Sequence, residues 1–341
     1  MLFTALMAAR ADDVYVASFN FGSITKFNAN GVGTSFANNV SEPEQMTFDA
    51  AGNLYLANYG AGTVLKFTTN GVRSTFLTVP GGPNGLAFDR AGNLHVATFD
   101  GGTIEKYSAA GTHLGTLATG LNHPIVLAFD QATNLYVSTY DNAIYQFTPA
   151  GAQSVFVGGV NGPTGMAFDR DGNLYVANFW GNTITKFGPD GAIIGDLPTT
   201  GLNEPYFIGF DSATNLYVSN FGTNTIEKFT PSGGVSVFAG LTTPSSLAVW
   251  PGLPLLVTNA TTVTTNPPSG LRVVPTGPGE VMLRFFGNTN QTFTVLMQTN
   301  GLVNRNNWMV LGAATVQASN LFQFIDTHAT NPVRIYAVRS P

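Results

Sequence analysis

The chain has 341 residues, 44% of them hydrophobic and only 10% charged, whereas an ordinary soluble domain carries about 25% charged residues. The 39 Gly and 19 Pro favour short strands and tight turns over a helical bundle, and the lack of Cys excludes disulfide bonds, thiol catalysis and cysteine-ligated metals. The net charge of −5, with no basic tract, argues against a nucleic-acid partner.

The N-terminus resembles the end of a secretory signal peptide. An apolar run that starts at Leu2 leads into a small-x-small pattern at Ala9–Ala11, which resembles a cleavage site, although the basic opening of such a signal is missing. We therefore expect residues 1–11 to be a signal remnant and the protein to be periplasmic or extracellular, with a cytoplasmic location as the alternative. No apolar run reaches the roughly 18 residues of a membrane helix, so we expect no membrane span.

From Asp13 onward the sequence repeats itself about every 40 residues. One anchor is a strand of the form Asn-Leu-Tyr-Val-Ala-Asn, which begins at Asp13, Asn53, Asn93, Asn134, Asn173 and Asn215. A second anchor is a Pro three residues before a hydrophobic strand, found at Pro43, Pro83, Pro124, Pro163, Pro205 and Pro244. A third strand ends in Lys-aromatic in five repeats, and a fourth strand follows a Gly that comes next. Four short strands per 40 residues predict the blades of a β-propeller.

Both faces of the repeated strands are largely apolar, so each blade must be covered on both sides by its neighbours. The N-terminal stretch Val14–Phe36 supplies strands two to four of a blade, and Pro244–Trp250 supplies a lone strand one. Pairing these two ends predicts an all-β, six-bladed propeller over residues 12–258. Leu255–Thr258 would be an exit segment, or alternatively a surplus strand of an imperfect seventh blade.

The repeats resemble those of the NHL-type six-bladed propellers and of the streptogramin-lyase-like and gluconolactonase-like propellers. The resemblance rests on a pattern that reads Pro163-Thr-Gly-Met-Ala-Phe-Asp169, Gly172-Asn-Leu-Tyr-Val-Ala-Asn178, Ile184-Thr-Lys-Phe187 and Gly191. It covers residues 13–250 and implies the propeller fold. It does not choose a function, because such propellers include interaction modules, ligand binders and lyases.

A second module follows the repeats. Residues 259–270 are rich in Thr and contain a Pro pair, which is typical of an extended linker. Over residues 271–341 the sequence predicts six or seven short strands in a small β-sandwich. The segments around Trp308, Asp326 and Tyr336 resemble immunoglobulin- or fibronectin-like modules of exported bacterial proteins, which implies a spacer or attachment role.

Several recurrent residues have a structural interpretation. The carboxylates at the end of strand one can accept backbone N–H bonds and fix the next turn; they are Asp49, Asp89, Asp130, Asp169 and Asp211. The five lysines share one repeat position and can cover the sheet with their stems. Aromatic residues also recur just after strand two, at Phe19, Tyr59, Phe99, Tyr140, Phe179 and Phe221. Their regular recurrence favours packing between blades, and a ring that stacks on ligands is the alternative.

Function in a repeat protein is expected where the repeat breaks. The loops entering strand one and those joining strands two and three should share one face of the propeller, over the central channel. Irregular polar or bulky residues in these loops form the predicted ligand-binding face: Glu42, Glu44, Asp100, His123, Asp141, Trp180, Glu204, Tyr206 and Phe207.

No catalytic residue can be assigned, and no metal or other cofactor is predicted. Asp100, His123 and Asp141 come from neighbouring blades and are weak candidates for a divalent Ca or Zn site. The related lyases depend on converging His residues, whereas only His123 is suitably placed here, so the enzyme assignment stays uncertain and leans towards no. We expect a monomeric binding or interaction scaffold for an unknown protein, carbohydrate or small molecule; the alternative is a metal-dependent hydrolase or lyase on the same face.

Overall fold

The computed structural model describes residues 12–250 with their side chains and, outside that range, only the backbone of short strands. The chain divides into two compact units, one of residues 11–251 and one that combines residues 1–10 with 252–341. In the described part of the chain, no helix has the length and hydropathy needed to span a bilayer.

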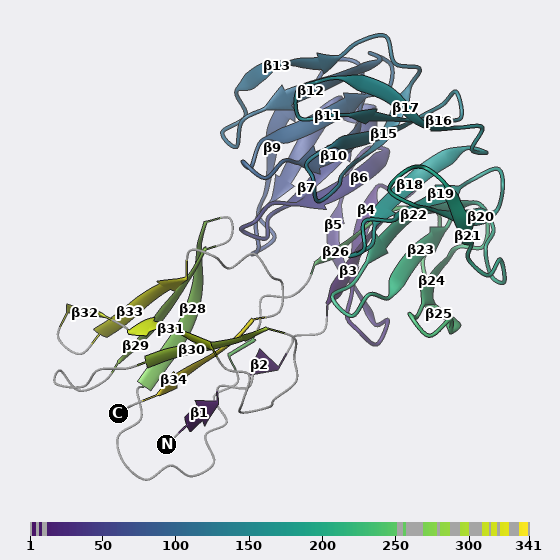
Figure 1. The fold of residues 1–341 in the computed structure, drawn as a ribbon. Coiled ribbons are helices and arrows are strands. Elements are labelled where there is room, and N and C mark those ends of the chain that lie inside the picture. Colours follow the sequence, from purple (N-terminus) through teal and green to yellow (C-terminus); the bar gives the residue numbers. More distant parts are fainter. Residues whose placement is uncertain are drawn as a thin grey trace. The chain divides into compact units, whose positions relative to one another are not determined.

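The first unit is a β-propeller in which six four-stranded antiparallel sheets surround a central axis (Figure 1). Blade one holds β6 (Pro43–Phe48), β7 (Leu54–Asn58), β8 (Thr63–Phe67) and β9 (Arg73–Thr78); blade two holds β10 (Pro83–Phe88), β11 (Leu94–Thr98), β12 (Thr103–Tyr107) and β13 (His113–Ala118). Blade three holds β14 (Pro124–Phe129), β15 (Leu135–Thr139), β16 (Ala143–Phe147) and β17 (Gln153–Gly158). Blade four holds β18 (Pro163–Phe168), β19 (Leu174–Asn178), β20 (Thr183–Phe187) and β21 (Ile193–Asp196); blade five holds β22 (Pro205–Phe210), β23 (Leu216–Asn220), β24 (Thr225–Phe229) and β25 (Val235–Gly240).

Both ends of the propeller chain build the sixth blade. Its strands are, from the axis outward, β26 (Pro244–Trp250), β3 (Asp13–Ser18), β4 (Ser23–Phe27) and β5 (Gly33–Asn38). Leu247 pairs with Val16 and Val249 pairs with Val14 in an antiparallel ladder. This confirms the predicted closure of six blades by a C-terminal strand one.

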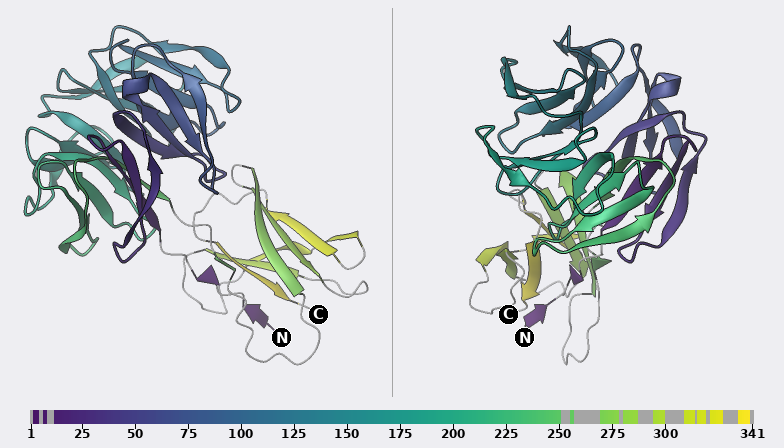
Figure 2. Two further views of the ribbon diagram at one scale, coloured as in Figure 1. Left: turned by 180° about the vertical axis from the view of Figure 1, so that it is seen from behind. Right: turned by 90° about the vertical axis from the view of Figure 1, so that its right-hand side faces the viewer.

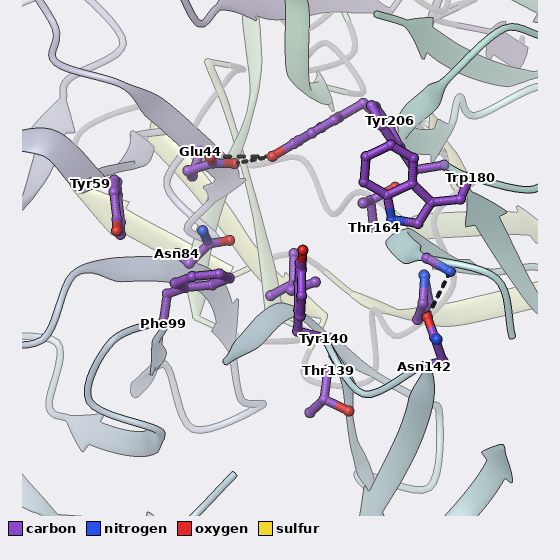
Figure 3. A pocket seen from close by; sticks show the side chains of 14 residues that line it. Glu44, Tyr59, Asn84, Phe99, Thr139, Tyr140, Asn142, Thr164, Trp180 and Tyr206 are labelled. Carbon is purple, nitrogen blue, oxygen red and sulfur yellow. Dashed lines mark hydrogen bonds between the residues drawn. The ribbon is translucent and has the colours of Figure 1, made fainter. Parts of the chain in front are cut away.

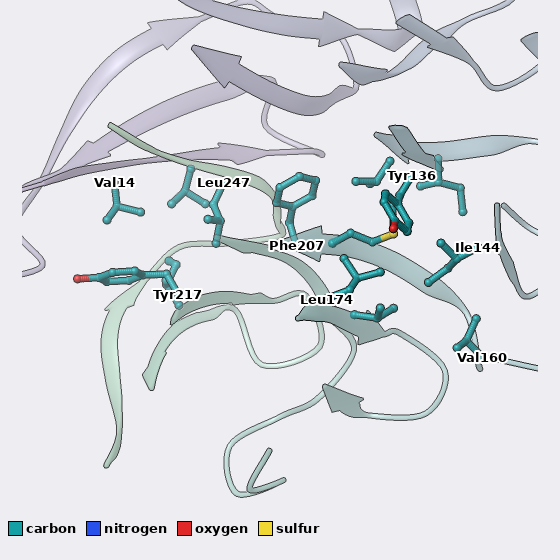
Figure 4. Packing of buried hydrophobic residues seen from close by; sticks show 14 of the residues in the cluster. Val14, Tyr136, Ile144, Val160, Leu174, Phe207, Tyr217 and Leu247 are labelled. Atoms are coloured by element: carbon teal, nitrogen blue, oxygen red, sulfur yellow. The ribbon is translucent and has the colours of Figure 1, made fainter. Parts of the chain in front are cut away.

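Apolar side chains fill the space between the blades. The six innermost strands contact their neighbours all round the ring, including β26 with β6. Figure 4 shows one buried cluster, to which the closing strands contribute Val14 and Leu247 and blade five contributes Phe207 and Tyr217. The outermost strands, by contrast, are largely exposed. The two-sided apolar pattern of the repeat is therefore explained by radial packing.

The recurrent carboxylates fix the turns between the first and second strands, as predicted. Asp169 Oδ1 accepts hydrogen bonds from the backbone N–H groups of Asp171 and Asn173 at 3.0 and 2.9 Å. Lys186 Nζ lies 3.1 Å from Asp169 Oδ2 and 5.0 Å from the ring centre of Tyr175. Asp49, Asp89, Asp130 and Asp211 accept the equivalent backbone bond. These carboxylates are structural and lie at the end of the innermost strands that is remote from the prolines.

The second unit also consists of strands. They are β1 (Leu2–Thr4), β2 (Met7–Ala8), β27 (Leu255–Leu256), β28 (Ser269–Gly277), β29 (Glu280–Phe286), β30 (Thr294–Thr299), β31 (Met309–Ala313), β32 (Thr315–Ala318), β33 (Leu321–Asp326) and β34 (Arg334–Arg339). They form two four-stranded sheets, ordered β1-β34-β30-β31 and β28-β29-β33-β32, and the pair β2-β27. Because β27 pairs with β2, it adds no seventh blade.

Two expectations for this unit are not decided. Residues 259–268 of the predicted linker lie outside the described residues, and the immunoglobulin- or fibronectin-like character of the module stays a prediction. Within the predicted signal remnant, Leu2–Thr4 pairs with β34. Figure 2 shows the strands of both units from two further sides.

Candidate functional site

Two sets of loops meet at one end of every blade. The Pro that opens each innermost strand pairs with the last residue of the second strand, as Pro43 does with Asn58 and Pro163 with Asn178. The loop that precedes the Pro therefore lies beside the loop that follows the second strand. In all six blades the residue before the Pro has a left-handed backbone, with φ values from 46° to 71°.

A break in the strand pairing shapes this end of the channel. The register of each innermost strand shifts directly after the Pro, which is the mark of a β-bulge. Bulges leave residues unpaired and re-aim their side chains. The residue that follows the Pro differs in all six blades: Glu44, Asn84, Ile125, Thr164, Tyr206 and Ser245. This is a position where the otherwise regular repeat carries a different chemical group on every blade.

The first five of these residues line a single cavity of about 350 Å³ at the channel mouth (Figure 3). The other lining residues are Tyr59, Phe99, Thr139, Tyr140, Asn142, Gly162, Pro163, Phe179 and Trp180. The volume lies within the usual range of small-molecule sites, about 300–1,000 Å³. Aromatic rings make up much of the wall, with a few polar groups among them.

Gln45 follows Glu44 on β6, and its side chain crosses the channel just below the residues that line the cavity. Its Oε1 accepts hydrogen bonds from the backbone N–H groups of Leu86 and Leu127 at 2.9 and 3.0 Å, and its Nε2 donates to the carbonyl of Leu127 at 3.0 Å. One side chain of blade one thereby ties together the innermost strands of blades one, two and three. Val126 and Phe207, at the matching positions of blades three and five, are 2% and 5% exposed. The cavity thus has a packed and hydrogen-bonded base.

Glu44 is a buried carboxyl in this cavity, 6% exposed. The Tyr206 hydroxyl donates a hydrogen bond to it, with O···O distances of 3.1 Å to Oε2 and 3.3 Å to Oε1. Burial raises the pKa of Glu44 to about 8, the bond from Tyr206 opposes that rise, and the negative charge of Glu42 adds to it. No Lys or Arg is among the described residues that line the cavity. Glu44 is therefore mostly protonated at pH 7.

Asn84 presents the second polar group. Its side chain is 5% exposed, and its Oδ1 has no hydrogen-bond partner within residues 12–250. A buried acceptor without a donor costs about 1–3 kcal/mol. Such a group in a native protein calls for an explanation, and a ligand N–H that draws the amide round towards the cavity is one.

Replacing Glu44 with Gln should change how stability depends on pH. The unfolded protein releases this proton near pH 4.5, but the folded protein keeps it until about pH 8. Stability of the wild type should therefore fall as the pH rises from 4.5 to 8. Glu44→Gln lacks that loss, so we expect its Tm to exceed the wild-type Tm by at least about 5 °C at pH 8 and by little at pH 4.5. Thermal unfolding of both proteins across this range tests it, and parallel pH curves would contradict it.

Three of the nine residues predicted for the binding face line the cavity: Glu44, Trp180 and Tyr206. Phe207 does not, because it lies one residue deeper and packs into the buried cluster of Figure 4. Glu42 and Asp100 border a shallower hollow beside Tyr59, whose hydroxyl donates to Asp100 Oδ2 at 3.0 Å. Glu204 uses its backbone, accepting a bond from Phe221 N–H and donating one to Asn182 Oδ1.

The weak metal candidates point to different partners. His123 is exposed; its ring centre lies 4.6 Å from that of Phe99, with the ring planes inclined at 54°, and its Nδ1 lies 2.8 Å from Asn122 Oδ1. Asp141 accepts hydrogen bonds from Thr139 and Tyr145. Within the described part of the chain, no three His, Asp or Glu side chains gather as metal ligands would. The residues present do not fit a metal ion here.

One set of cavity residues was missed from the sequence, and a second was named there with packing preferred over a ligand-facing ring. Asn84, Ile125 and Thr164 were overlooked, although their position after the Pro is an available signal. The recurrent aromatics were assigned to packing between blades, yet four of the six line the cavity: Tyr59, Phe99, Tyr140 and Phe179. Tyr59 and Tyr140 also contact Phe99 edge to face, with 6.1 and 6.4 Å between ring centres. The ring of aromatics therefore both packs and forms a wall.

Comparisons with known proteins agree with this architecture. A family model described as the virginiamycin B lyase family matches residues 3–251, and a search of curated proteins found no match. A chain of a nidogen/laminin complex is 18% identical, with a TM-score of 0.63 over 70% of this chain and 98% of that chain. A streptogramin B lyase is 18% identical, with a TM-score of 0.56 over 72% and 89%. A gluconolactonase from Xanthomonas campestris is 20% identical, with a TM-score of 0.53 over 64% and 86%. At these identities the solved structures show a shared fold.

Proposed function

The chain belongs to the virginiamycin B lyase family, and we propose that it binds a small ligand in the cavity at the mouth of its propeller. The observation that carries this proposal is the change from a regular repeat to five different side chains around one cavity. A rigid frame of paired strands holds these side chains, and Gln45 braces the base. Such a site is preorganised, so little conformational entropy is lost when a ligand binds.

The described residues favour binding over catalysis. Glu44 has the raised pKa of a general acid, but its hydrogen-bond partner Tyr206 is itself buried, and burial raises the pKa of Tyr206 well above its ordinary value. Two neutral groups hydrogen-bonded to each other supply neither a base nor a nucleophile at pH 7. Ligand binding, by contrast, requires no base or nucleophile, and the aromatic rings with Glu44 and Asn84 are sufficient for it.

Trp180→Ala should weaken ligand binding at least about tenfold, because truncating a wall aromatic removes both apolar contact and ring stacking. Ligand-observed NMR on the full chain, with a panel of small aromatic molecules and monosaccharides, identifies ligands and measures the loss. Phe21→Ala is the matched control: Phe21 is an exposed aromatic in a loop at the same end of blade six and does not line the cavity. Equal binding by the two variants would contradict the proposal.

The second candidate is a metal-dependent hydrolase or lyase on the same face, which family membership favours. Incubation of the protein with virginiamycin B and with gluconolactone, with and without added Mg²⁺, Ca²⁺ or Zn²⁺, separates the two candidates. Mass spectrometry should show no conversion above that of a protein-free control under every condition if the site only binds. Turnover that depends on Glu44 would establish the enzyme instead.

Export and a monomeric state also remain part of the proposal. Cell fractionation and light scattering of the purified chain test them.

A further inference from the structure

We propose that the ligand of the cavity is an organic ammonium ion that carries at least one N–H group. The inference rests on the proposed binding function and names its ligand class. Three features coincide at the channel mouth: a wall of aromatic rings, a buried carboxyl without a basic partner, and a rim whose charged groups are acidic. Each feature favours a cation for its own physical reason.

The rim sets the sign of the electrostatic field. In residues 12–250, the loops that enter the innermost strands and those that follow the second strands contain no Lys or Arg. Their acidic residues are Glu42, Asp100, Asp141 and Glu204. One cation reaches these loops from a neighbouring strand, since Arg73 donates to the backbone carbonyls of Asn38 and Asn39. The lysines of the propeller lie at the other end of the blades, where Lys66, Lys106 and Lys186 pair with the turn carboxylates. One end of the channel thus attracts cations and disfavours anions.

Glu44 supplies the counter-charge at the base. An ionised carboxylate in this position has no basic partner among the described lining residues, so burial favours its neutral form. A bound ammonium ion provides the missing partner, and Glu44 then releases its proton to solvent as the ion pair forms. The single O–H of Tyr206 lies within hydrogen-bond distance of both carboxyl oxygens of Glu44, and the nearby titratable groups are Glu42 and Tyr59. None of these three groups offers a competing positive charge.

The aromatic residues that line the cavity can contact both the charge and the organic part of such a ligand. Figure 3 shows the rings of Tyr59, Phe99, Tyr140 and Trp180 around the cavity. Phe179 lines it as well. A cation within about 6 Å of a ring centre gains about 0.5–2 kcal/mol from the ring quadrupole, more where water is excluded. Neutral apolar groups on the ligand pack against the same rings.

Asn84 indicates which kind of ammonium ion the cavity should bind. Its Oδ1 accepts no hydrogen bond within the described residues and is closed off from solvent, so it pairs with a ligand N–H only once the amide turns towards the cavity. A primary, secondary or tertiary ammonium N–H can donate that bond, whereas a quaternary ammonium cannot. The asymmetry of the site, with Glu44 on blade one and Asn84 on blade two, places both acceptors on neighbouring strands of the channel.

Isothermal titration calorimetry of the full chain with three probes of similar size tests the inference. Benzylammonium is the expected ligand type, benzyl alcohol replaces the charge by a neutral hydroxyl, and benzyltrimethylammonium keeps the charge but lacks N–H. We expect benzylammonium to bind at least about tenfold more tightly than either of the others, and Trp180→Ala to weaken it. Repeating the titration at pH 7 in two buffers of different ionisation enthalpy should show release of close to one proton per ligand.

The Glu44→Gln variant completes the test. It should bind benzylammonium about tenfold more weakly than the wild type and release no proton, and its loss of affinity for benzyl alcohol should be clearly smaller than that for benzylammonium. If benzyl alcohol binds as tightly as benzylammonium and Trp180→Ala weakens both, the ammonium class is overturned while the binding function stands. If no probe binds and Trp180→Ala changes nothing in the wider ligand panel, both are overturned.

Discussion

A chain that ends at residue 243 should fail to form the propeller, whereas a chain that ends at Pro251 should form it fully. The first truncation removes β26 and leaves five complete blades beside a sixth that has lost its innermost strand. The backbone of β3 would lose its ladder partners on that side, and Leu247 and Ala248 would no longer cover the neighbouring blades. An open edge of this length is a template for aggregation.

The loss should be total because closure is a single cooperative feature. In a closed ring every blade is covered on both faces by its neighbours, whereas a broken ring exposes the apolar faces of two blades to water. We expect the shorter chain to be aggregated or to lack a cooperative thermal transition by circular dichroism and gel filtration. Leu247→Asp in the full chain is an independent check, since it places a carboxyl at a position that is 1% exposed and should cost more than about 4 kcal/mol. A monomeric, cooperatively folding chain that ends at residue 243 would contradict this account of closure.

The propeller architecture could be predicted because the same sequence pattern recurs along the chain, once for each blade. Each blade has the same Pro and the same two-sided apolar strand, and five of the six have the same turn carboxylate, so several weak signals reinforce one another. The closing pair, Pro244–Trp250 with the strand from Asp13, followed from a count of missing and surplus strands. The second module has no such repeat, so the sequence predicts a count of six or seven short strands there and does not place Thr315–Ala318.

The cavity was harder to predict for a physical reason. Periodicity shows which positions share a role, but the aromatics Tyr59 and Phe99 have two roles at once, packing against each other and facing the channel. The residue after the Pro looks like an ordinary strand position in sequence. Only the bulge, seen as a register shift, turns it towards the axis. Loop irregularity alone gave Glu42 and His123 the same weight as Glu44, although the backbone fixes both of them in left-handed turns on the rim.

The site and the fold are coupled through the groups just beneath the cavity. Glu44 and Gln45 are adjacent on β6, so one faces the ligand cavity while the other holds three innermost strands together. Burying a group as unfavourable as Glu44 is tolerated only where the surrounding strands cannot move apart. The brace is therefore part of what keeps the cavity preorganised.

Gln45→Ala should be among the most destabilising single substitutions at this end of the propeller. The change removes the acceptor for the N–H groups of Leu86 and Leu127 and the donor to the Leu127 carbonyl, all of them buried. Each buried group left without a partner costs about 1–3 kcal/mol, so we expect a loss of about 3–5 kcal/mol in the free energy of unfolding. Urea denaturation of the full chain measures it.

Gln131→Ala is the matched control, because Gln131 makes a comparable bond from Nε2 to the carbonyl of Arg170, at 2.9 Å, but is exposed. Water replaces that partner, so this change should stay within about 0.5 kcal/mol of the wild type. A loss below about 1 kcal/mol for Gln45→Ala would mean that water enters the channel and satisfies the freed groups. The base of the cavity would then be hydrated, and ligand binding should weaken in that variant even though the propeller remains folded.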